Sequence, residues 1–198
     1  MGRLIEVVGP SGVGKTTLVR ALSRSAQFVT AYEGHAERPF QALFKHDRRY
    51  GLANQLDYLL FRAEQERELR VSPLVGLMDG GLDLDYHGFA RLFHARGLLS
   101  DSEFDLCRRF YELTRQYLPL PDLIIHLTAK EEIIRARLAI RRRINIASAE
   151  DTQLFNQFLI EWLSMIPASH LVRLDVSGED PQFRSCVSFI LKRLEASN

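Results

Sequence analysis

Gly9-Pro10-Ser11-Gly12-Val13-Gly14-Lys15-Thr16 is the stretch of this chain that decides its fold. It matches the phosphate-binding loop pattern, in which a glycine is followed by four free positions and then by Gly-Lys-Ser or Gly-Lys-Thr. The apolar run Leu4–Val8 before it has the composition of a short buried strand, and Thr17–Leu22 after it has the amphipathic pattern of a helix. A strand, a glycine-rich turn and a helix in this order form the local context that the motif requires.

Each part of the motif has a chemical reason. The glycines at positions 9, 12 and 14 let the backbone turn tightly, so that its N–H groups point inward at a phosphate. The positive end of the following helix adds to that field. Lys15 can reach the terminal phosphates, and the Thr16 hydroxyl can ligate Mg²⁺. We therefore expect the residues from Gly9 to Thr17 to bind ATP together with Mg²⁺.

Length and composition indicate an ordinary globular protein. The chain has 198 residues, of which 46% are hydrophobic and 26% charged, and this suits one domain spanning residues 1–198. A net charge of +1 gives no overall basic field, so we expect no nucleic acid polymer as a partner. No apolar run approaches transmembrane length, and the first strand begins too early to leave room for a signal peptide. Cys107 and Cys186 lack metal or redox spacing, which fits the reducing environment of the cytosol. We therefore expect a cytoplasmic protein, and from the lack of a long apolar run we expect no membrane partner.

Strand-like and helical patterns alternate along the chain, which is typical of a parallel sheet with helices on both faces. We expect a three-layer α/β fold of the P-loop NTPase type, with strands at Leu4–Val8, Phe28–Ala31, Leu74–Met78, Leu123–Leu127 and Leu171–Leu174. Later helices are expected at Asn54–Arg70, Ser102–Tyr117, Lys130–Ile140, Asp151–Met165 and Pro181–Leu194, with Asp101 as the cap of the second.

In open α/β sheets the ligand lies beyond the carboxyl ends of the strands. The phosphate loop follows the first strand, Glu33 the second and Asp79 the third, so we expect them at one edge. There Thr16 and Asp79 would hold Mg²⁺, directly or through water, and Glu33 would accept a proton from an attacking alcohol. Two structural alternatives stay open: Asp79 as a cap of the Gly80-Gly81 turn, and Glu33 as a surface loop residue.

An arginine-rich stretch follows the fourth strand. Arg137, Arg141 and Arg143 are expected in a helical lid, at about residues 137–150, that folds over the phosphates and neutralises developing charge. A solvated helix face is the structural alternative. The loop Asp175–Asp180 after the last strand is suited to lie against an adenine ring.

Gln55 and Arg62 lie seven residues apart on a predicted helix, which brings both side chains to nearly the same face. The Gln55 amide and the donors of Arg62 would then reach one ligand together. An amphipathic surface helix is the structural alternative.

These same residues resemble the deoxynucleoside kinase family, P-loop enzymes that phosphorylate the 5′-hydroxyl of deoxynucleosides. The resemblance runs from the first strand to about residue 162. It implies that Glu33 is the base and that Gln55 and Arg62 contact the nucleobase. It also implies that Asp79 is the acidic residue after the third strand and that Asp85, six residues further, faces the nucleobase.

The chain differs from the family pattern at three places. It has Gly80-Gly81 where the family has Arg-Ser, Phe44 where the family places a tyrosine for the sugar 3′-hydroxyl, and Asn145-Ile146 where the lid has an acidic pair. The triphosphate half of the site is therefore intact, while the half that binds the acceptor is altered. A site that loses hydrogen-bond partners for a hydroxyl binds that hydroxyl less well.

We expect an ATP-dependent kinase that acts on a small-molecule hydroxyl, the 5′-hydroxyl of a nucleoside. A kinase of another small alcohol, a sugar or cyclitol, is the alternative that Gly80-Gly81, Phe44 and Ile146 indicate. A regulatory module that binds a triphosphate with little transfer is the alternative that the missing Arg-Ser pair indicates. The resemblance also implies a homodimer, for which the apolar stretches Phe89–Phe93 and Phe104–Leu113 are candidate surfaces; core helices are the other interpretation.

Overall fold

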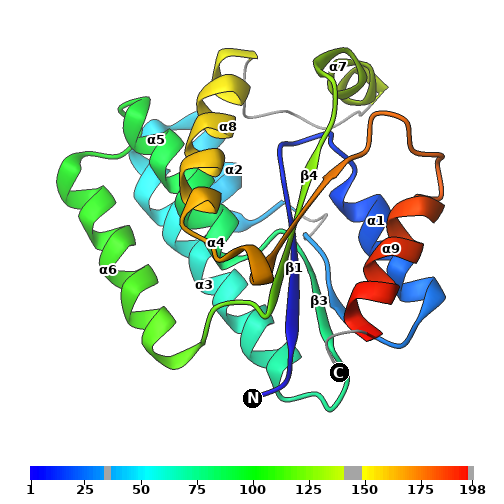
Figure 1. Ribbon diagram of the computed structural model, residues 1–198. Helices are drawn as coiled ribbons and strands as arrows, with labels where there is room; N and C mark the ends of the chain where they lie inside the picture. The colour runs from blue at the N-terminus through cyan, green and yellow to red at the C-terminus, as the bar shows by residue number, and fades with distance from the viewer. Residues whose placement is uncertain (34–36, 141–148, 196–198) are drawn as a thin grey trace.

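The computed structural model describes residues 1–33, 37–140 and 149–195. At its centre is a sheet of five parallel strands in the order β2-β3-β1-β4-β5. The strands are β1 (Leu4–Val8), β2 (Val29–Ala31), β3 (Gly76–Asp79), β4 (Leu123–Thr128) and β5 (Leu171–Asp175). This confirms the predicted parallel sheet, and Figure 1 shows helices on both of its faces.

The middle strand, β1, sends alternate side chains into two different cores, as the pleat of a strand requires. Ile5 and Val7 pack in the core beneath α1 (Lys15–Ser25) and α9 (Arg184–Glu195). Val8 joins the core on the other face, which α8 (Ala149–Ser164) covers. Glu6 is the one charged side chain of β1, and it is 1% exposed.

The face opposite α1 and α9 carries most of the remaining helices (Figure 1). They are α3 (Gly51–Arg70), α4 (Leu82–Leu84), the π-helix η2 (Asp85–Ala90), α5 (Arg91–Ala95) and α6 (Asp101–Tyr117). The shorter elements α2 (Pro39–His46) and η1 (Arg48–Tyr50) precede α3, α7 (Glu131–Ile140) follows β4, and η3 (Ala168–His170) precedes β5. Within the described ranges, no helix is long and apolar enough to cross a membrane.

Among the boundaries that differ from the prediction, two have a local reason. β3 begins at Gly76, two residues late, because Ser72 Oγ accepts a hydrogen bond from Leu74 N at 3.1 Å and holds a turn there. α9 begins at Arg184, three residues late, because Phe183 has a φ of 55°, in the left-handed region that a helix cannot include.

The predicted cap of α6 was wrong by one residue. Ser100 is the cap: its Oγ accepts from Glu103 N at 3.4 Å, and Glu103 Oε2 accepts from Ser100 N at 2.7 Å. This is a capping box, in which two unpaired N–H groups are satisfied reciprocally. Asp101 is instead the first helical residue, where its charge still favours the helix N-terminus.

The two apolar stretches considered as association surfaces behave differently. Phe93 is buried and stacks on Phe44, and Phe89 packs on Phe155, so the two phenylalanine rings of this stretch belong to the core. On α6, by contrast, Leu113 is 53% exposed.

Candidate active site

The phosphate loop joins β1 to α1 at the carboxyl edge of the sheet. Gly12 and Gly14 have φ angles of 83° and 115°, which a residue with a Cβ rarely adopts. Lys15 folds back over the loop, and its Nζ donates to Gly9 O at 3.0 Å and to Pro10 O at 3.2 Å. The loop therefore has the tight turn that the motif predicts, and it places an ammonium group at its centre.

Thr16 and Asp79 meet beside this loop. Thr16 Oγ1 donates to Asp79 Oδ2 at 2.5 Å, and Asp79 is fully buried at the end of β3. Its other oxygen, Oδ1, has no hydrogen-bond partner among the described residues, although buried polar atoms are normally paired. The Gly80-Gly81 turn does not need Asp79 as a cap, because Gly80 N donates to Val7 O at 2.9 Å. A hydroxyl beside an unpaired carboxylate oxygen fits Mg²⁺, which prefers oxygen ligands.

Gln55, Arg62 and Asp85 form a buried triad next to this pair. Arg62 Nε donates to Asp85 Oδ2 at 3.0 Å, and Gln55 Nε2 donates to Asp85 O at 3.2 Å. The three residues are at most 4% exposed. The seven-residue spacing therefore does bring both helical side chains to one place, and the surface-helix alternative is wrong because that face of α3 is buried.

Electrostatics within the triad favour a close pair of Asp85 and Arg62. Burial raises the pKa of Asp85 to about 6, while Arg62 opposes the increase and Glu33 adds to it. The Arg62 guanidinium also lies against Gly80, where a Cβ would be 3.2 Å from Arg62 Nη2. The triad and the Thr16–Asp79 pair are thus parts of one site.

Glu33 follows β2 and is half-buried, and its charge acts on both Arg62 and Asp85. Gln65, which sequence reasoning missed, ties this loop to the triad. Gln65 Oε1 accepts from Arg62 Nη1 at 3.0 Å, and Gln65 Nε2 donates to Tyr32 O, also at 3.0 Å. The available signal was its position three residues after Arg62, a spacing at which helical side chains are neighbours.

The first part of the arginine-rich stretch reaches the phosphate loop. Arg137 Nη1 donates to Val13 O at 2.6 Å, and a Cβ at Gly12 would be 2.9 Å from Leu138, so α7 lies directly on the loop. Arg135 instead pairs with Glu131 on the exposed face of α7. Residues 141–148, which include Arg141, Arg143, Asn145 and Ile146, lie outside the described residues.

Two further predicted contacts are those of Phe44 with the sugar and of the loop after β5 with the adenine ring. Phe44 stacks on Phe93 with ring centroids 5.2 Å apart, so its ring is part of the core, and a contact with a sugar stays a prediction. The loop after β5 leads to Phe183, whose ring would be 2.7 Å from a Cβ at Gly14. The loop therefore approaches the phosphate loop, while its contact with an adenine ring stays a prediction.

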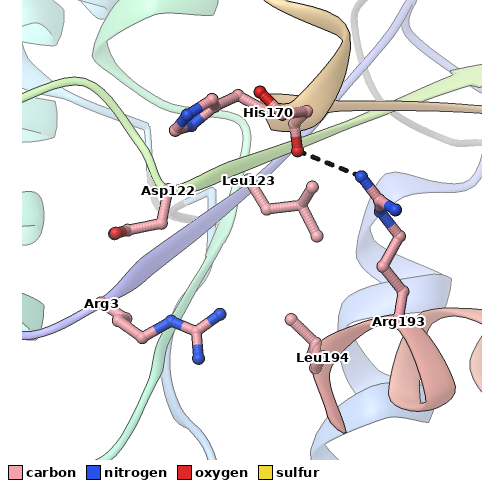
Figure 2. Close-up of a pocket in the computed structure, with 7 residues that line it drawn as sticks. Arg3, Asp122, Leu123, His170, Arg193 and Leu194 are labelled. Carbon is pink, nitrogen blue, oxygen red and sulfur yellow. Dashed lines mark hydrogen bonds between the residues drawn. The ribbon is translucent and has the colours of Figure 1, made fainter. Parts of the chain in front are cut away.

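A cavity of about 500 Å³ lies at the opposite, amino-terminal edge of the sheet (Figure 2). It is lined by residues that precede or begin strands and by the end of α9: Arg3, Asp122, Leu123, Ser169, His170, Arg193 and Leu194. Ligands of open α/β sheets bind beyond the carboxyl ends of the strands, so this cavity is not the candidate active site.

Comparison with known proteins identifies the family. The family model described as deoxynucleoside kinase matches residues 5–187. The chain belongs to the deoxynucleoside kinase family. The phosphate loop, the Thr16–Asp79 pair and the Gln55–Arg62–Asp85 triad all lie within the matched residues.

Relatives within this kinase family share moderate sequence identity with the chain. A deoxyadenosine kinase of Dictyostelium discoideum is 29% identical over 143 residues, which cover 72% of this chain and 58% of that protein. A deoxyadenosine/deoxycytidine kinase of Bacillus subtilis (strain 168) is 27% identical over 143 residues, covering 71% of this chain and 66% of that protein. The matched part of the chain therefore spans less than two thirds of either relative.

Solved structures of the same kinase class share the fold. Deoxyadenosine kinase from M. mycoides with bound dCTP superposes with a TM-score of 0.79 at 17% identity, covering 98% of this chain and 99% of that one. The same enzyme with bound dATP gives a TM-score of 0.78 at 18% identity, covering 97% and 99%. At these identities the likeness supports the P-loop fold that the sequence predicts.

Proposed function

We propose that this deoxynucleoside kinase family member is an ATP-dependent kinase that transfers the γ-phosphoryl group to the 5′-hydroxyl of a nucleoside. The observation that carries the proposal is the meeting of the phosphate loop, the Thr16–Asp79 pair and the Gln55–Arg62–Asp85 triad at one sheet edge. An amide, a guanidinium and a carboxyl group together offer the donors and acceptors that the edge of a nucleobase needs. Family membership favours this acceptor over a sugar or cyclitol, and favours transfer over regulation alone.

The transfer step assigns roles to Glu33, Lys15 and Arg137. Glu33 accepts the proton of the 5′-hydroxyl while that oxygen attacks the γ-phosphorus. The bond between the γ-phosphorus and the oxygen it shares with the β-phosphate breaks, and ADP leaves. Lys15 and Arg137, both already against the loop, stabilise the charge on the transferring oxygens. Arg141 and Arg143 are proposed to join them from a lid at about residues 137–150.

Thr16 and Asp79 are the proposed ligands of Mg²⁺, directly or through water. The bound ion would neutralise charge on the β- and γ-phosphate oxygens. Within residues 1–33, 37–140 and 149–195, no three His, Cys, Asp or Glu side chains gather into a metal site. Phosphate and water oxygens would therefore complete the shell, as is usual for Mg²⁺.

The acceptor half of the site is proposed to compensate for the family contacts that this sequence lacks. Gly80 supplies no cation, but the Arg62 guanidinium lies beside it and brings positive charge to that place. Phe44 offers a ring without a hydroxyl, so we expect the sugar to be held with fewer hydrogen bonds.

Product analysis tests the proposal directly. The purified protein is incubated with Mg·ATP and a panel of deoxynucleosides, ribonucleosides, sugars and cyclitols, and the products are read by mass. We expect the mass of one phosphate to be added to at least one nucleoside. Phosphate only on another alcohol, or ATP binding with no product from any acceptor, would refute the proposal.

Three further proposals concern the domain, the cellular compartment and the oligomeric state of this protein. We propose one P-loop kinase domain over residues 1–198, acting in the cytoplasm, where ATP is made and where free thiols such as the buried Cys107 and Cys186 persist. We also propose a homodimer that uses the exposed apolar side chains of α6, among them Leu106 and Leu113. Light scattering of the wild type and of Leu113→Glu tests the dimer, which the charge should dissociate.

A further inference from the structure

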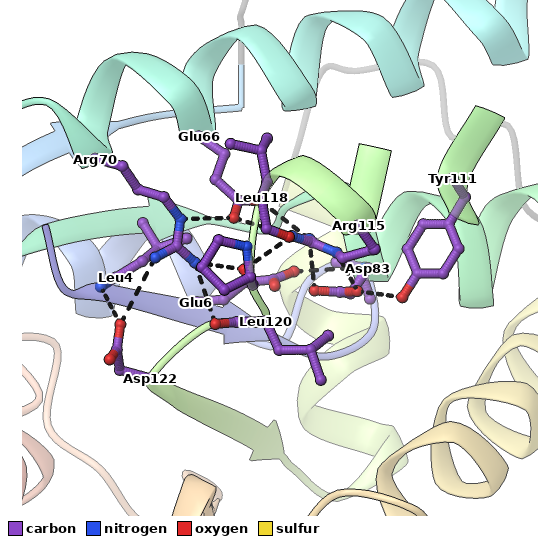
Figure 3. A network of polar contacts seen from close by, with 12 residues as sticks. Leu4, Glu6, Glu66, Arg70, Asp83, Tyr111, Arg115, Leu118, Leu120 and Asp122 are labelled. Carbon is purple, nitrogen blue, oxygen red and sulfur yellow. Dashed lines mark hydrogen bonds and ion pairs between the residues drawn. The ribbon is translucent and has the colours of Figure 1, made fainter. Parts of the chain in front are cut away.

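A cluster of buried charges lies between the sheet and helices α3 and α6 (Figure 3). We call it the acid–arginine cluster, and its members are Glu6, Glu66, Arg70, Asp83 and Arg115. Asp83 is fully buried, and Glu6 and Glu66 are each 1% exposed. Charged groups at this depth are costly unless they are paired, and the proposed transfer step uses none of them.

Arg115 of α6 joins two carboxylates. Its Nη1 and Nη2 donate to Glu66 Oε1 and Oε2 at 2.9 and 3.0 Å. Its Nη2 and Nε donate to Asp83 Oδ2 and Oδ1 at 2.8 and 3.2 Å. Tyr111, also on α6, donates its hydroxyl to Asp83 Oδ1 at 2.6 Å. Asp83 therefore cannot leave its place without unpairing buried charged groups, which is strongly unfavourable.

Glu6 packs on Asp83 from the sheet side. Burial, and next the charge of Asp83, raise the pKa of Glu6 well above its usual range, and the two side chains share a hydrogen bond. Burial and Asp83 thus favour the protonated form of Glu6, while Glu66 and Asp83 are the carboxylates that pair with the guanidinium groups of the cluster. Its Oε1 accepts from Leu84 N at 3.4 Å. Gly81 provides the room, because a Cβ there would be 2.5 Å from this oxygen.

Asp83 lies in the short segment that carries two carboxylates of the candidate site, those of Asp79 and Asp85. Asp79 begins this segment and Asp85 ends it, with Gly80 and Gly81 between Asp79 and Asp83. Gly80 N donates to Val7 O at 2.9 Å, which holds the start of the segment on the sheet, but Gly80 and Gly81 have no side chain that could hold the part beyond it. The side chain of Asp83 attaches the segment to α6, a separate helix.

We propose that Asp83 is a positioning residue of the kinase site. Clamped by Arg115 and Tyr111, it fixes the segment that leads from Asp79, which pairing of β3 with β1 holds, to Asp85, and thereby the place of Asp85 beside Arg62. The inference rests on the proposed function of these two carboxylates. Asp83 acts through the backbone, and its own side chain is turned toward α6 and Glu6.

Within the acid–arginine cluster, Arg70 is a control for variants that destabilise the fold without releasing Asp83. Arg70 and Arg115 both donate to the same Glu66 oxygen, Oε1, at 2.9 Å, and both are buried. Arg70 also donates to the backbone oxygens of residues 2, 119 and 120, of which it shares the one of Pro119 with Arg115, and it lies 3.8 Å from the Asp122 carboxylate. Its partners do not include Asp83, to which Arg115 donates. Arg70→Met and Arg115→Met therefore each remove one positive charge and one bond to Glu66 Oε1. Arg115→Met also removes the bond to Glu66 Oε2, and it alone releases Asp83.

The experiment compares these two variants and the milder Tyr111→Phe, which removes one hydroxyl from the clamp and keeps the ring. Steady-state kinetics give kcat and KM for the nucleoside, and hydrogen exchange gives the amide protection of residues 80–90. We expect Arg115→Met to lower kcat/KM for the nucleoside about 10²-fold, since a misplacement of about 1 Å can have that effect. Tyr111→Phe should show a smaller loss in the same direction, and both variants should exchange faster at residues 80–90.

Arg70→Met should be less stable than the wild type but keep its kcat, its KM and its protection at residues 80–90. The proposal is overturned if Arg70→Met and Arg115→Met change kinetics and exchange equally, or if neither Arg115→Met nor Tyr111→Phe changes them. Should the wild type phosphorylate no nucleoside, the proposed function fails, and the exchange comparison alone decides whether Asp83 fixes the segment.

Discussion

Replacing Gly81 with alanine would place a methyl group in the space that the Glu6 carboxyl occupies. The new Cβ would lie 2.5 Å from both Cδ and Oε1 of Glu6 and 3.0 Å from its Cγ, well inside van der Waals contact. Glu6 is 1% exposed, so it has no route into solvent. Gly81 has a φ of 171°, which any residue adopts, and the whole effect is therefore steric.

The size of this effect follows from the contacts that must give way. Overfilling a packed core costs about 1–3 kcal/mol. Displacing Glu6 also weakens its hydrogen bond with Leu84 N, which adds about 1 kcal/mol. We therefore expect Gly81→Ala to lower the free energy of unfolding by about 2–4 kcal/mol. For a chain of this length that corresponds to a Tm lower by about 4–16 °C.

A double-mutant cycle identifies the cause. Urea unfolding is measured for Gly81→Ala, Glu6→Ala and the double variant, and the double variant should be less destabilised than the sum by at least about 1 kcal/mol. Gly80→Ala is the matched control: Gly80 has a φ of 69°, so alanine is strained by about 1–2 kcal/mol, and this cost should simply add to that of Glu6→Ala. Additive effects of Gly81→Ala and Glu6→Ala would refute the reasoning, because the clash is the only coupling it assumes.

Four other predictions concern the candidate site. Lys15→Ala should abolish product formation in a mass-based kinase assay, and retained turnover would mean that the loop is not the phosphate cradle. Glu33→Gln should lower kcat about 10²–10⁴-fold while ATP binding, measured by calorimetry, stays as in the wild type; an unchanged kcat would remove Glu33 as the base. Arg62→Ala should raise the nucleoside KM far more than the ATP KM, and equal changes in both would place Arg62 outside the acceptor half. Because the pKa of Asp85 rises from an ordinary 3.8 to about 6, the folded state holds this proton more tightly than the unfolded state. The wild type should therefore lose up to about 3 kcal/mol of stability as pH rises from about 4 to about 6, and urea unfolding of Asp85→Asn should lack that part of the pH dependence.

The sequence by itself determined the fold class and much of the site. The phosphate loop is readable because its function is local: a tight turn, a lysine and a hydroxyl must follow one another along the chain. The five strands were found within three residues of their observed ends, since apolar runs and turn residues are local as well. Gln55 and Arg62 were placed together by helix periodicity, and the structure bears out their common face.

Only the tertiary structure decided which charged side chains lie in the interior. Glu6, Glu66, Asp83 and Arg115 come from one strand and three different helices, and no periodic pattern links them. Their pairing depends on distances between elements far apart in sequence, as in the 49 residues between Glu66 and Arg115. The same holds for Gly81, which looks like a loss from the family motif in the sequence. In the folded chain the missing side chain of Gly81 leaves the space that the Glu6 carboxyl occupies, and a buried carboxyl group needs both room and a hydrogen-bond partner.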